Sequence, residues 1–272
     1  WFEKNPDRGR NMRFAINSDL CPETPKVLDK LIEKSHSVPN LIIYTSMEAT
    51  GIQGEYIRDG LNYNEWKSNI HRVLKEGNIS QLFMMMTINS LCLNSITEFM
   101  DEMLDLREEY GDRSPVMTLN ILRFPSFQSA AILPEEIKTQ YKDTLEKWLL
   151  SERPQKLLDE GEKESVIRLI DYLDIVKTPH KNTAETPKLY NDFKSFFAQY
   201  DIRREKDFVS TFPGPLAEWF KSLEADVPNR DQILHGVNST NTINQIILDP
   251  ATTKEYDGGD DKHEQQDSTN LE

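Results

Sequence analysis

Long apolar stretches are missing from this sequence of 272 residues. A helix needs about 20 consecutive apolar residues to cross a bilayer, and no run approaches that length. The opening residues, WFEKNPDRGR, contain neither the apolar core of a signal peptide nor a cleavage site. We therefore expect no membrane partner. Because the opening reads like the middle of a helix, we also expect the chain to be a fragment of a longer protein.

Cysteine is scarce as well, with only Cys21 and Cys92 in the whole chain. Two distant cysteines make no disulfide framework, which favours the reducing cytoplasm as the location. They are also too few to hold an iron–sulfur cluster, which normally takes three or four thiolates. We expect each to act as a small buried apolar residue.

Signature motifs of the common enzyme classes are absent. The sequence has no Gly-rich phosphate loop, no nucleophile elbow and no H-E-x-x-H helix. Its five histidines share no spacing typical of metal ligands, so we expect no metal site within this chain.

Positive charge is in short supply, since 32 basic residues face 46 acidic ones and the formal net charge is −14. This balance argues against nucleic acid as a partner, because nucleic-acid binding relies on Lys and Arg at the phosphates. The segment 249–272 carries eight acidic residues, two lysines and no periodic apolar positions. We expect it to be a disordered acidic tail.

The sequence does contain four apolar runs that alternate with amphipathic segments. The runs cover residues 12–16, 41–45, 82–88 and 116–122, and their starts are 29, 41 and 34 residues apart. Such spacing is typical of repeated βα units with parallel strands. The strands are nearly continuous in apolar residues, which predicts a sheet covered on both faces. Residues 1–150 are thus expected to form an α/β domain.

Local signals mark where the intervening helices begin. Thr24 and Pro25 suit an N-cap and a first helical residue, and another helix is expected to open near Asn62. Ser95 and Glu98 have the spacing of a capping box. The methionines at 84, 85 and 86 alternate sides of a strand, so they are expected to fill core on both sides rather than bind a metal.

Beyond residue 150 no strand of comparable strength appears. Apolar residues recur at helical spacing, so residues 151–248 are expected to form a mostly helical extension. The predicted helices are marked by Val166, Ile167, Ile170 and Leu173, by Leu189, Phe193, Phe196, Phe197 and Tyr200, and by the segment LAEWFKSL.

Polar residues stand at the ends of the predicted strands, where α/β proteins hold their ligands. They are Asn17 and Ser18, Ser46 and Glu48, Thr87 and Asn89, and Arg123. Each could instead be a loop residue or a helix cap. Arg58, in the segment EYIRDG, offers paired donors that suit a carboxylate. It could also simply pair at the surface with Asp59 or Glu55.

The stretch YTSMEATGIQGEYIRDGLNYNEWKSNIHRVL, residues 44–74, resembles the fourth-strand region of radical S-adenosylmethionine enzymes. Ser46 and Arg58 stand 12 positions apart, as in the peptide-modifying branch of that family. FAINSDL resembles the third strand, TINSLCLNSITEF the fifth and LNILRFPSFQSAAILP the sixth. Residues 181–220 resemble the end of twitch-domain-containing members, so that the similarity covers roughly residues 10–224.

The resemblance implies strands three to six of a partial TIM-like barrel that binds S-adenosylmethionine. It implies that Ser46 and Arg58 hold the methionyl carboxylate and the ribose side, and that Asn89 and the backbone near Arg123 border the adenosine. Glu48 and Asn17 join them in the implied pocket. The family generates a 5′-deoxyadenosyl radical with a [4Fe–4S] cluster, and its members with such ends often modify peptides. A peptide is therefore one possible substrate.

The sequence also departs from the family pattern. Glu48 replaces the usual Asp, Ala49 the usual Gly, and Ile16 and Ser18 the usual Thr and Gly around Asn17. The C-x-x-x-C-x-x-C loop and the Gly-Gly-Glu motif are not in this sequence and would lie upstream of Trp1. We therefore expect this chain alone to be inactive in radical generation.

The alternative is a non-catalytic homologue that binds a peptide or protein. Its motivation is the basic cluster Arg203, Arg204 and Lys206 within YDIRREKDF. These side chains could equally pair with the neighbouring acids Asp201, Glu205 and Asp207.

Overall fold

The computed structural model describes residues 1–176 and 185–235. The chain divides into two compact units, Trp1–Pro228 and Asn229–Glu272. In the second unit the described part is the short helix α12 (Arg230–His235). The acidic tail expected at 249–272 lies outside the described residues. Within the described ranges, no helix is both long enough and apolar enough to cross a membrane.

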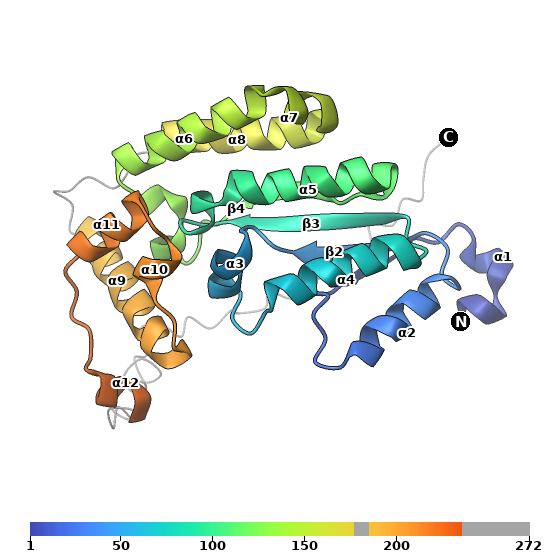
Figure 1. Ribbon diagram of the computed structural model, residues 1–272, viewed down its shortest axis with the longest axis horizontal. Helices are drawn as coiled ribbons and strands as arrows, with labels where there is room; N and C mark the ends of the chain where they lie inside the picture. The colour runs from blue at the N-terminus through green and yellow to red at the C-terminus, as the bar shows by residue number, and fades with distance from the viewer. Residues whose placement is uncertain (177–184, 236–272) are drawn as a thin grey trace, which may run out of the picture. The chain divides into compact units, whose positions relative to one another are not determined.

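The first unit is an α/β structure built on one parallel sheet of four strands (Figure 1). The strands are β1 (Phe14–Asn17), β2 (Leu41–Ser46), β3 (Gln81–Ile88) and β4 (Val116–Ile121), in that order across the sheet. The register pairs Ile43 with Leu82 and Met84 with Met117. Consecutive strands are therefore neighbours, as the apolar runs predicted.

The helices of the first unit follow the strands as α2 (Pro25–Ser35), α4 (Tyr63–Glu76) and α5 (Ile96–Tyr110), with the short α1 (Pro6–Gly9) before β1 and α3 (Gly51–Ile57) after β2. After β4 come α6 (Glu135–Leu150), α7 (Glu152–Leu157), α8 (Glu160–Ile175), α9 (Glu185–Arg204), α10 (Phe208–Thr211) and α11 (Pro215–Ser222). Single 3₁₀ turns are η1 (Phe2–Lys4), η2 (Cys92–Asn94), η3 (Gly111–Arg113), η4 (Ser126–Gln128) and η5 (Ala130–Ile132).

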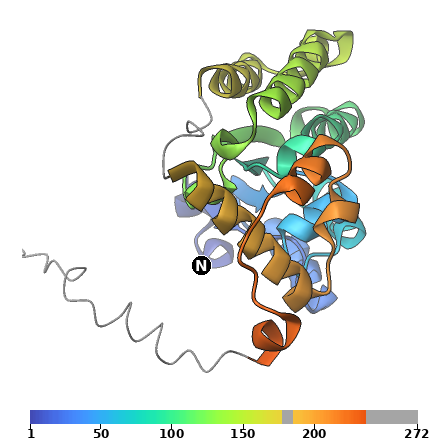
Figure 2. The ribbon, with the colours of Figure 1, turned by 90° about the vertical axis from the view of Figure 1, so that its left-hand side faces the viewer.

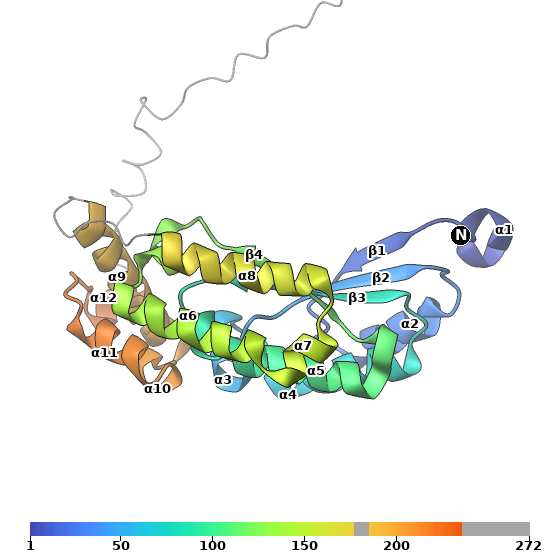
Figure 3. The same cartoon turned by 90° about the horizontal axis from the view of Figure 1, so that it is seen from above.

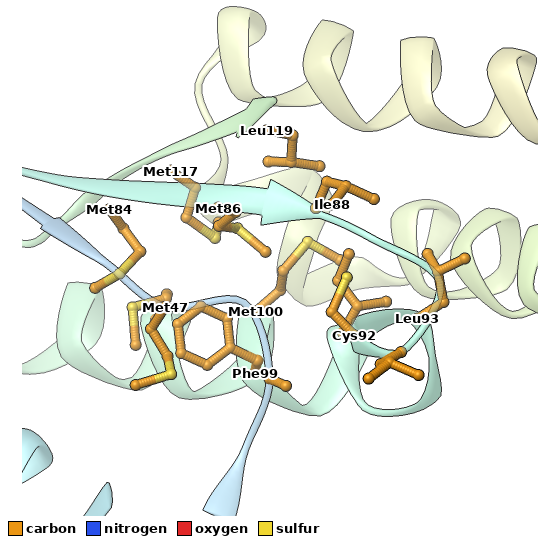
Figure 4. Packing of buried hydrophobic residues seen from close by; sticks show 14 of the residues in the cluster. Met47, Met84, Met86, Ile88, Cys92, Leu93, Phe99, Met100, Met117 and Leu119 are labelled. Atoms are coloured by element: carbon orange, nitrogen blue, oxygen red, sulfur yellow. The ribbon is translucent and has the colours of Figure 1, made fainter. Parts of the chain in front are cut away.

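The sheet has one buried face. Right-handed crossovers between successive neighbouring strands all return on the same side. Accordingly, α2, α4 and α5 lie on one side of the strands (Figures 1 and 3). The core on this side is rich in sulfur: Met84, Met86 and Met117 of the strands meet Met100 and Phe99 of α5 (Figure 4). Flexible thioethers fill such irregular space well and contact aromatic rings favourably.

The opposite face is not buried, and the expectation of a sheet covered on both faces is wrong. Along β2 and β3, every second residue is only partly buried. This open face carries Tyr44 and Phe83, whose rings stack 5.0 Å apart at 13°. It also carries Ser46 and Met85, which are register partners. Burial alternates from one residue to the next along each strand, as in any strand with one covered face. The side chains are apolar on both faces, however, so this alternation cannot be recognised in the hydrophobic pattern of the sequence.

The helix starts follow the local signals in part. Thr24 and Asn62 are N-caps as predicted, and the Asn62 side chain accepts from the backbone N of Glu65. Ser95 is the N-cap of α5, but the predicted capping box is not formed. Its hydroxyl accepts a hydrogen bond from the backbone N of Thr50 instead, and so ties α5 to the loop after β2.

A capping box does occur at α8, where Asp159 and Glu162 exchange bonds with each other's backbone. Glu162 does more than cap, because it also accepts from the backbone N of Met117 in β4 at 2.9 Å. One turn and a half further along, Arg168 donates to the carbonyl of Leu119 at 3.2 Å. Thus α8 runs along β4 at one edge of the sheet, while β1 forms the other edge (Figure 3).

The helices α9, α10 and α11 lie close together (Figure 2). They share an aromatic core that reaches α3. Phe193, Phe208 and Phe220 pack together, with the Phe208 and Phe220 rings stacked 4.0 Å apart. Tyr56 of α3 joins them through its contact with Phe212. Phe196 and Ile167, two of the apolar residues that marked the predicted helices, are 40% and 46% exposed.

Candidate functional site

The carboxyl ends of the strands open onto a small cavity of about 110 Å³. The loops after β2, β3 and β4 all contribute to it, and α9 closes it from the side. Its lining comprises Tyr56, Ile57, Asn89, Leu91, Gln128, Phe196, Phe197 and Tyr200. This is the edge where parallel α/β sheets place their ligand sites, and it is the edge at which the sequence placed its candidates.

Two of the predicted residues form a buried ion pair beside this edge. Arg58 donates from Nη2 and Nε to one oxygen of Glu48, Oε2, at 2.5 Å and 3.2 Å. The carboxylate is almost fully buried, whereas 28% of the arginine side chain is exposed. Asp59 and Glu55, the surface partners considered for Arg58, are engaged elsewhere: Asp59 with Arg204 and Lys206, and Glu55 with the backbone N of Tyr63.

Burial is the main influence on the pKa of the carboxyl group in this pair. Desolvation raises the pKa of the Glu48 carboxyl above its ordinary value of 4.5, and it outweighs the opposing effects of Arg58 and of a backbone hydrogen bond with Thr87. The same charge acts on Cys92, whose thiol pKa is raised by complete burial and then by Glu48. Cys92 is therefore an inert thiol in the core, as the sequence predicted, while Cys21 is only partly buried.

Ser46 is the last residue of β2 and lies on the open face of the sheet. Within residues 1–176 and 185–235, its hydroxyl has no hydrogen-bond partner in the structure. The side chain two positions on, Glu48, is directed to the buried pair instead. Ser46 is thus free to meet a ligand from the open face, and Arg58 is held in place by a carboxylate.

The side chain of Asn89 stabilises the turn that follows β3. Its side-chain oxygen accepts from the backbone N of Leu91 and of Cys92, and its amide donates to the carbonyl of Thr87. These bonds fix the turn that follows β3. The alternative reading as a loop cap is therefore correct for this residue, although Asn89 also lines the small cavity.

Asn17 and Arg123 are exposed at the ends of β1 and β4. In the described part of the chain neither residue forms a hydrogen bond or ion pair with Glu48 or Arg58. The structure pairs Glu48 with Arg58 and places Asn89 in the lining of the small cavity, which neither Asn17 nor Arg123 is seen to line.

The contribution of α9 to this site could not be predicted from the sequence. Tyr200 donates its hydroxyl to the carbonyl of Tyr56 at 2.7 Å, and Tyr56 donates in turn to Asp201, also at 2.7 Å. Burial, followed by the hydrogen bond to Asp201, raises the pKa of Tyr56 and keeps the phenol neutral. These aromatic residues recur at helical spacing, which is the ordinary signature of core, so no sequence signal separates the two roles.

The basic cluster proposed for peptide binding is divided. Arg204 and Lys206 pair with Asp59, at 3.1 Å and 3.0 Å, rather than with the neighbouring acids Asp201, Glu205 and Asp207. Asp201 and Asp207 serve as backbone and hydroxyl acceptors around α10. Arg203 alone has no ion pair or hydrogen bond within the described residues.

No group of three or more His, Cys, Asp and Glu side chains that could hold a metal ion occurs in the described ranges. Comparison with known proteins adds no assignment, because no family model, curated protein or solved structure matches this chain.

Proposed function

We propose that this chain binds S-adenosylmethionine at the carboxyl edge of its sheet, as strands three to six of a partial TIM-like barrel in a radical S-adenosylmethionine enzyme. The observation that carries the proposal is the order of four parallel strands, each next to its neighbour in sequence, with helices on one face and the other face open. Such a sheet has the winding of a barrel wall, with the open face toward the interior and ligands at the strand ends.

The residues at this edge fit the methionyl end of the cofactor. A guanidinium group carries five donors, and Glu48 uses those on Nε and Nη2 of Arg58. The remaining Nη1 has no partner in the described residues and is available to a carboxylate. Ser46 offers a hydroxyl from the open face. Glu48 acts as a positioning residue, because its ion pair fixes the plane of the guanidinium.

Size decides where the ligand lies. The cavity of about 110 Å³ is well below the roughly 300–1,000 Å³ of ordinary ligand pockets. The adenosine part is therefore proposed to lie over the open sheet face, near Tyr44 and Phe83, whose stacked rings offer an apolar floor. Asn89 and the backbone near Arg123 border the site.

The cysteines of this chain do not fit a [4Fe–4S] cluster. There are two of them, Cys92 is fully buried, and burial raises the pKa of the Cys21 thiol to about 11. When bound beside a reducing cluster, S-adenosylmethionine supplies a 5′-deoxyadenosyl radical. This chain by itself is proposed to bind and orient the cofactor without generating the radical.

Isothermal titration calorimetry with S-adenosylmethionine tests the proposal. Arg58→Ala should weaken binding about tenfold or more, since it removes charge-assisted hydrogen bonds to a carboxylate. Ser46→Ala should weaken binding by less. Arg72→Ala is the matched control, because Arg72 also pairs with two carboxylates but sits on the outer surface of α4.

Circular dichroism of each variant would establish that the fold is retained. The proposal is wrong if the native chain binds no S-adenosylmethionine at millimolar concentration, or if folded Arg58→Ala and Arg72→Ala bind it equally well.

A further inference from the structure

A second and larger cavity lies on α9, next to the small one at the sheet edge. It measures about 370 Å³, within the range of ordinary ligand pockets. Its described lining comes from one helix: Phe196, Gln199, Tyr200, Arg203 and Arg204. These positions recur at intervals of three and four, so they form a single face along two turns. Phe196 and Tyr200 line both cavities.

Two flat aromatic surfaces form the apolar part of this cavity. The rings of Phe196 and Tyr200 are nearly parallel, with 17° between their planes and 6.2 Å between their centroids. Phe196 is held by Phe127 and Phe197, yet 40% of it remains exposed. Tyr200 is fixed by its hydroxyl bond to Tyr56, and burial raises its pKa to about 12, so the ring stays neutral. Both surfaces are therefore rigid platforms for another ring.

The polar part of the cavity is cationic. Among its described lining residues there are two guanidinium groups and no carboxylate. Arg204 is committed to Asp59 at 3.1 Å. Arg203, one position earlier, has no ion pair or hydrogen bond in residues 1–176 and 185–235. Gln199 adds an amide whose nitrogen donates to Ser195, which leaves its oxygen directed elsewhere.

We infer that this cavity binds a small aromatic ligand that carries a carboxylate or phosphate group. The ring would lie against Phe196 and Tyr200, and the anion would meet the guanidinium of Arg203. An unpaired arginine beside exposed rings suits this combination, because guanidinium binds planar oxyanions through two parallel hydrogen bonds. The apolar platform contributes by stacking. This inference uses none of the residues proposed to hold S-adenosylmethionine, although Phe196 and Tyr200 also line the small cavity at the sheet edge.

Titration of the native full chain with N-acetylphenylalanine, followed by calorimetry, tests the inference. Two control probes are used. The neutral N-acetylphenylalanine amide keeps the ring but lacks the charge, and acetate keeps the charge but lacks the ring. The carboxylate should bind at least about tenfold more tightly than either probe. Phenyl phosphate should bind as well, because it also combines a phenyl ring with negatively charged oxygens that a guanidinium can bind.

Substitutions locate the site. Arg203→Ala should reduce the affinity for N-acetylphenylalanine about tenfold to a hundredfold, and Arg203→Lys should restore part of it. Phe196→Ala, at an exposed position, should reduce it severalfold. Arg13→Ala, another exposed arginine without a partner in the described residues, should leave it unchanged.

The inference is overturned if the amide binds as well as the carboxylate, or if Arg203→Ala binds like Arg13→Ala. Failure of S-adenosylmethionine to bind would leave these results untouched, since the two sites are probed by different ligands and different arginines.

Discussion

Two buried arginine–glutamate pairs lie at opposite ends of the same sheet. Arg107 grips both carboxylate oxygens of Glu162, and its other hydrogen bonds go to Leu157, Pro115 and Ser114. Arg58 binds a single oxygen of Glu48 and keeps one nitrogen without a partner in the described part of the chain. The guanidinium of Arg107 thus has a hydrogen-bond acceptor at each of its nitrogens, whereas that of Arg58 does not.

Position explains the difference. Glu162 reaches the backbone of Met117, at the beginning of β4, whereas Glu48 comes after the end of β2. In βα structures the amino edge of the sheet serves stability and the carboxyl edge serves ligands. A saturated guanidinium has nothing left for a ligand, so Arg107 is a clamp. An unsaturated one can meet a ligand without first breaking its own ion pair.

The largest effect is expected from Arg107→Ala. It would leave the Glu162 carboxylate, 2% exposed, without its partner, and would also release three backbone or hydroxyl acceptors. Breaking one side of a buried pair typically costs about 3–5 kcal/mol of unfolding free energy. Urea denaturation at neutral pH measures this loss.

Arg153→Ala is the control for that loss. Arg153 also pairs with several acids, Asp105 and Glu108 among them, but on the surface of α5. Its removal should cost less than about 1 kcal/mol. Equal losses from the two variants would mean that Arg107 is not a clamp.

A smaller loss, about 2 kcal/mol at neutral pH, is expected from Arg58→Ala. Here Glu48 can escape the unpaired charge by taking up a proton, since burial already raises the pKa of its carboxyl. The folded state then holds the proton more tightly than the unfolded state. Stability is therefore kept below pH 4.5 and is lost as pH rises through the folded pKa.

Denaturation of this variant at a series of pH values checks the sign. The deficit relative to the native chain should shrink toward acid pH. A deficit that is constant with pH would show that Glu48 stays charged without Arg58.

The smallest effect is expected from Glu48→Gln, which keeps the shape and removes the titrating group. The native chain should lose stability relative to this variant as pH rises above 4.5, because burial raises the pKa of the Glu48 carboxyl more than Arg58 lowers it. The measurement is the difference between two curves of unfolding free energy against pH. Parallel curves would contradict the raised pKa.

Much of the fold could be predicted from the sequence, because the apolar runs and helix-capping residues agree with the tertiary structure. Apolar runs such as 82–88 became strands within one residue, and Asn62 opens its helix. The open face escaped prediction because Tyr44, Phe83 and Met85 are apolar although only partly buried. The helix α3 also escaped, since it has seven residues and two of them are glycine.

The sequence was enough to predict where the candidate site lies, but not which of its residues contact each other. Parallel strands end on one edge, so polar residues after each run had to gather there. Which of them touch depends on the chain path between them. The turn of α3 brings Arg58 back to Glu48, ten positions away, and no pairwise signal marks that return. The α9 residues lie about 140 positions from Tyr56, beyond any local pattern.

The position of α8 makes the two edges of the sheet unequal in their ability to accept a further strand. Its Glu162 and Arg168 occupy backbone groups that β4 turns outward, so a strand arriving there would have to displace a buried carboxylate and its arginine. β1 presents an exposed margin with Phe14 and Asn17. Within the described residues, β1 is therefore the edge of the sheet that remains open to a further strand. Closure into a cylinder, pairing with a second molecule and fibril-like association would all compete for that one margin.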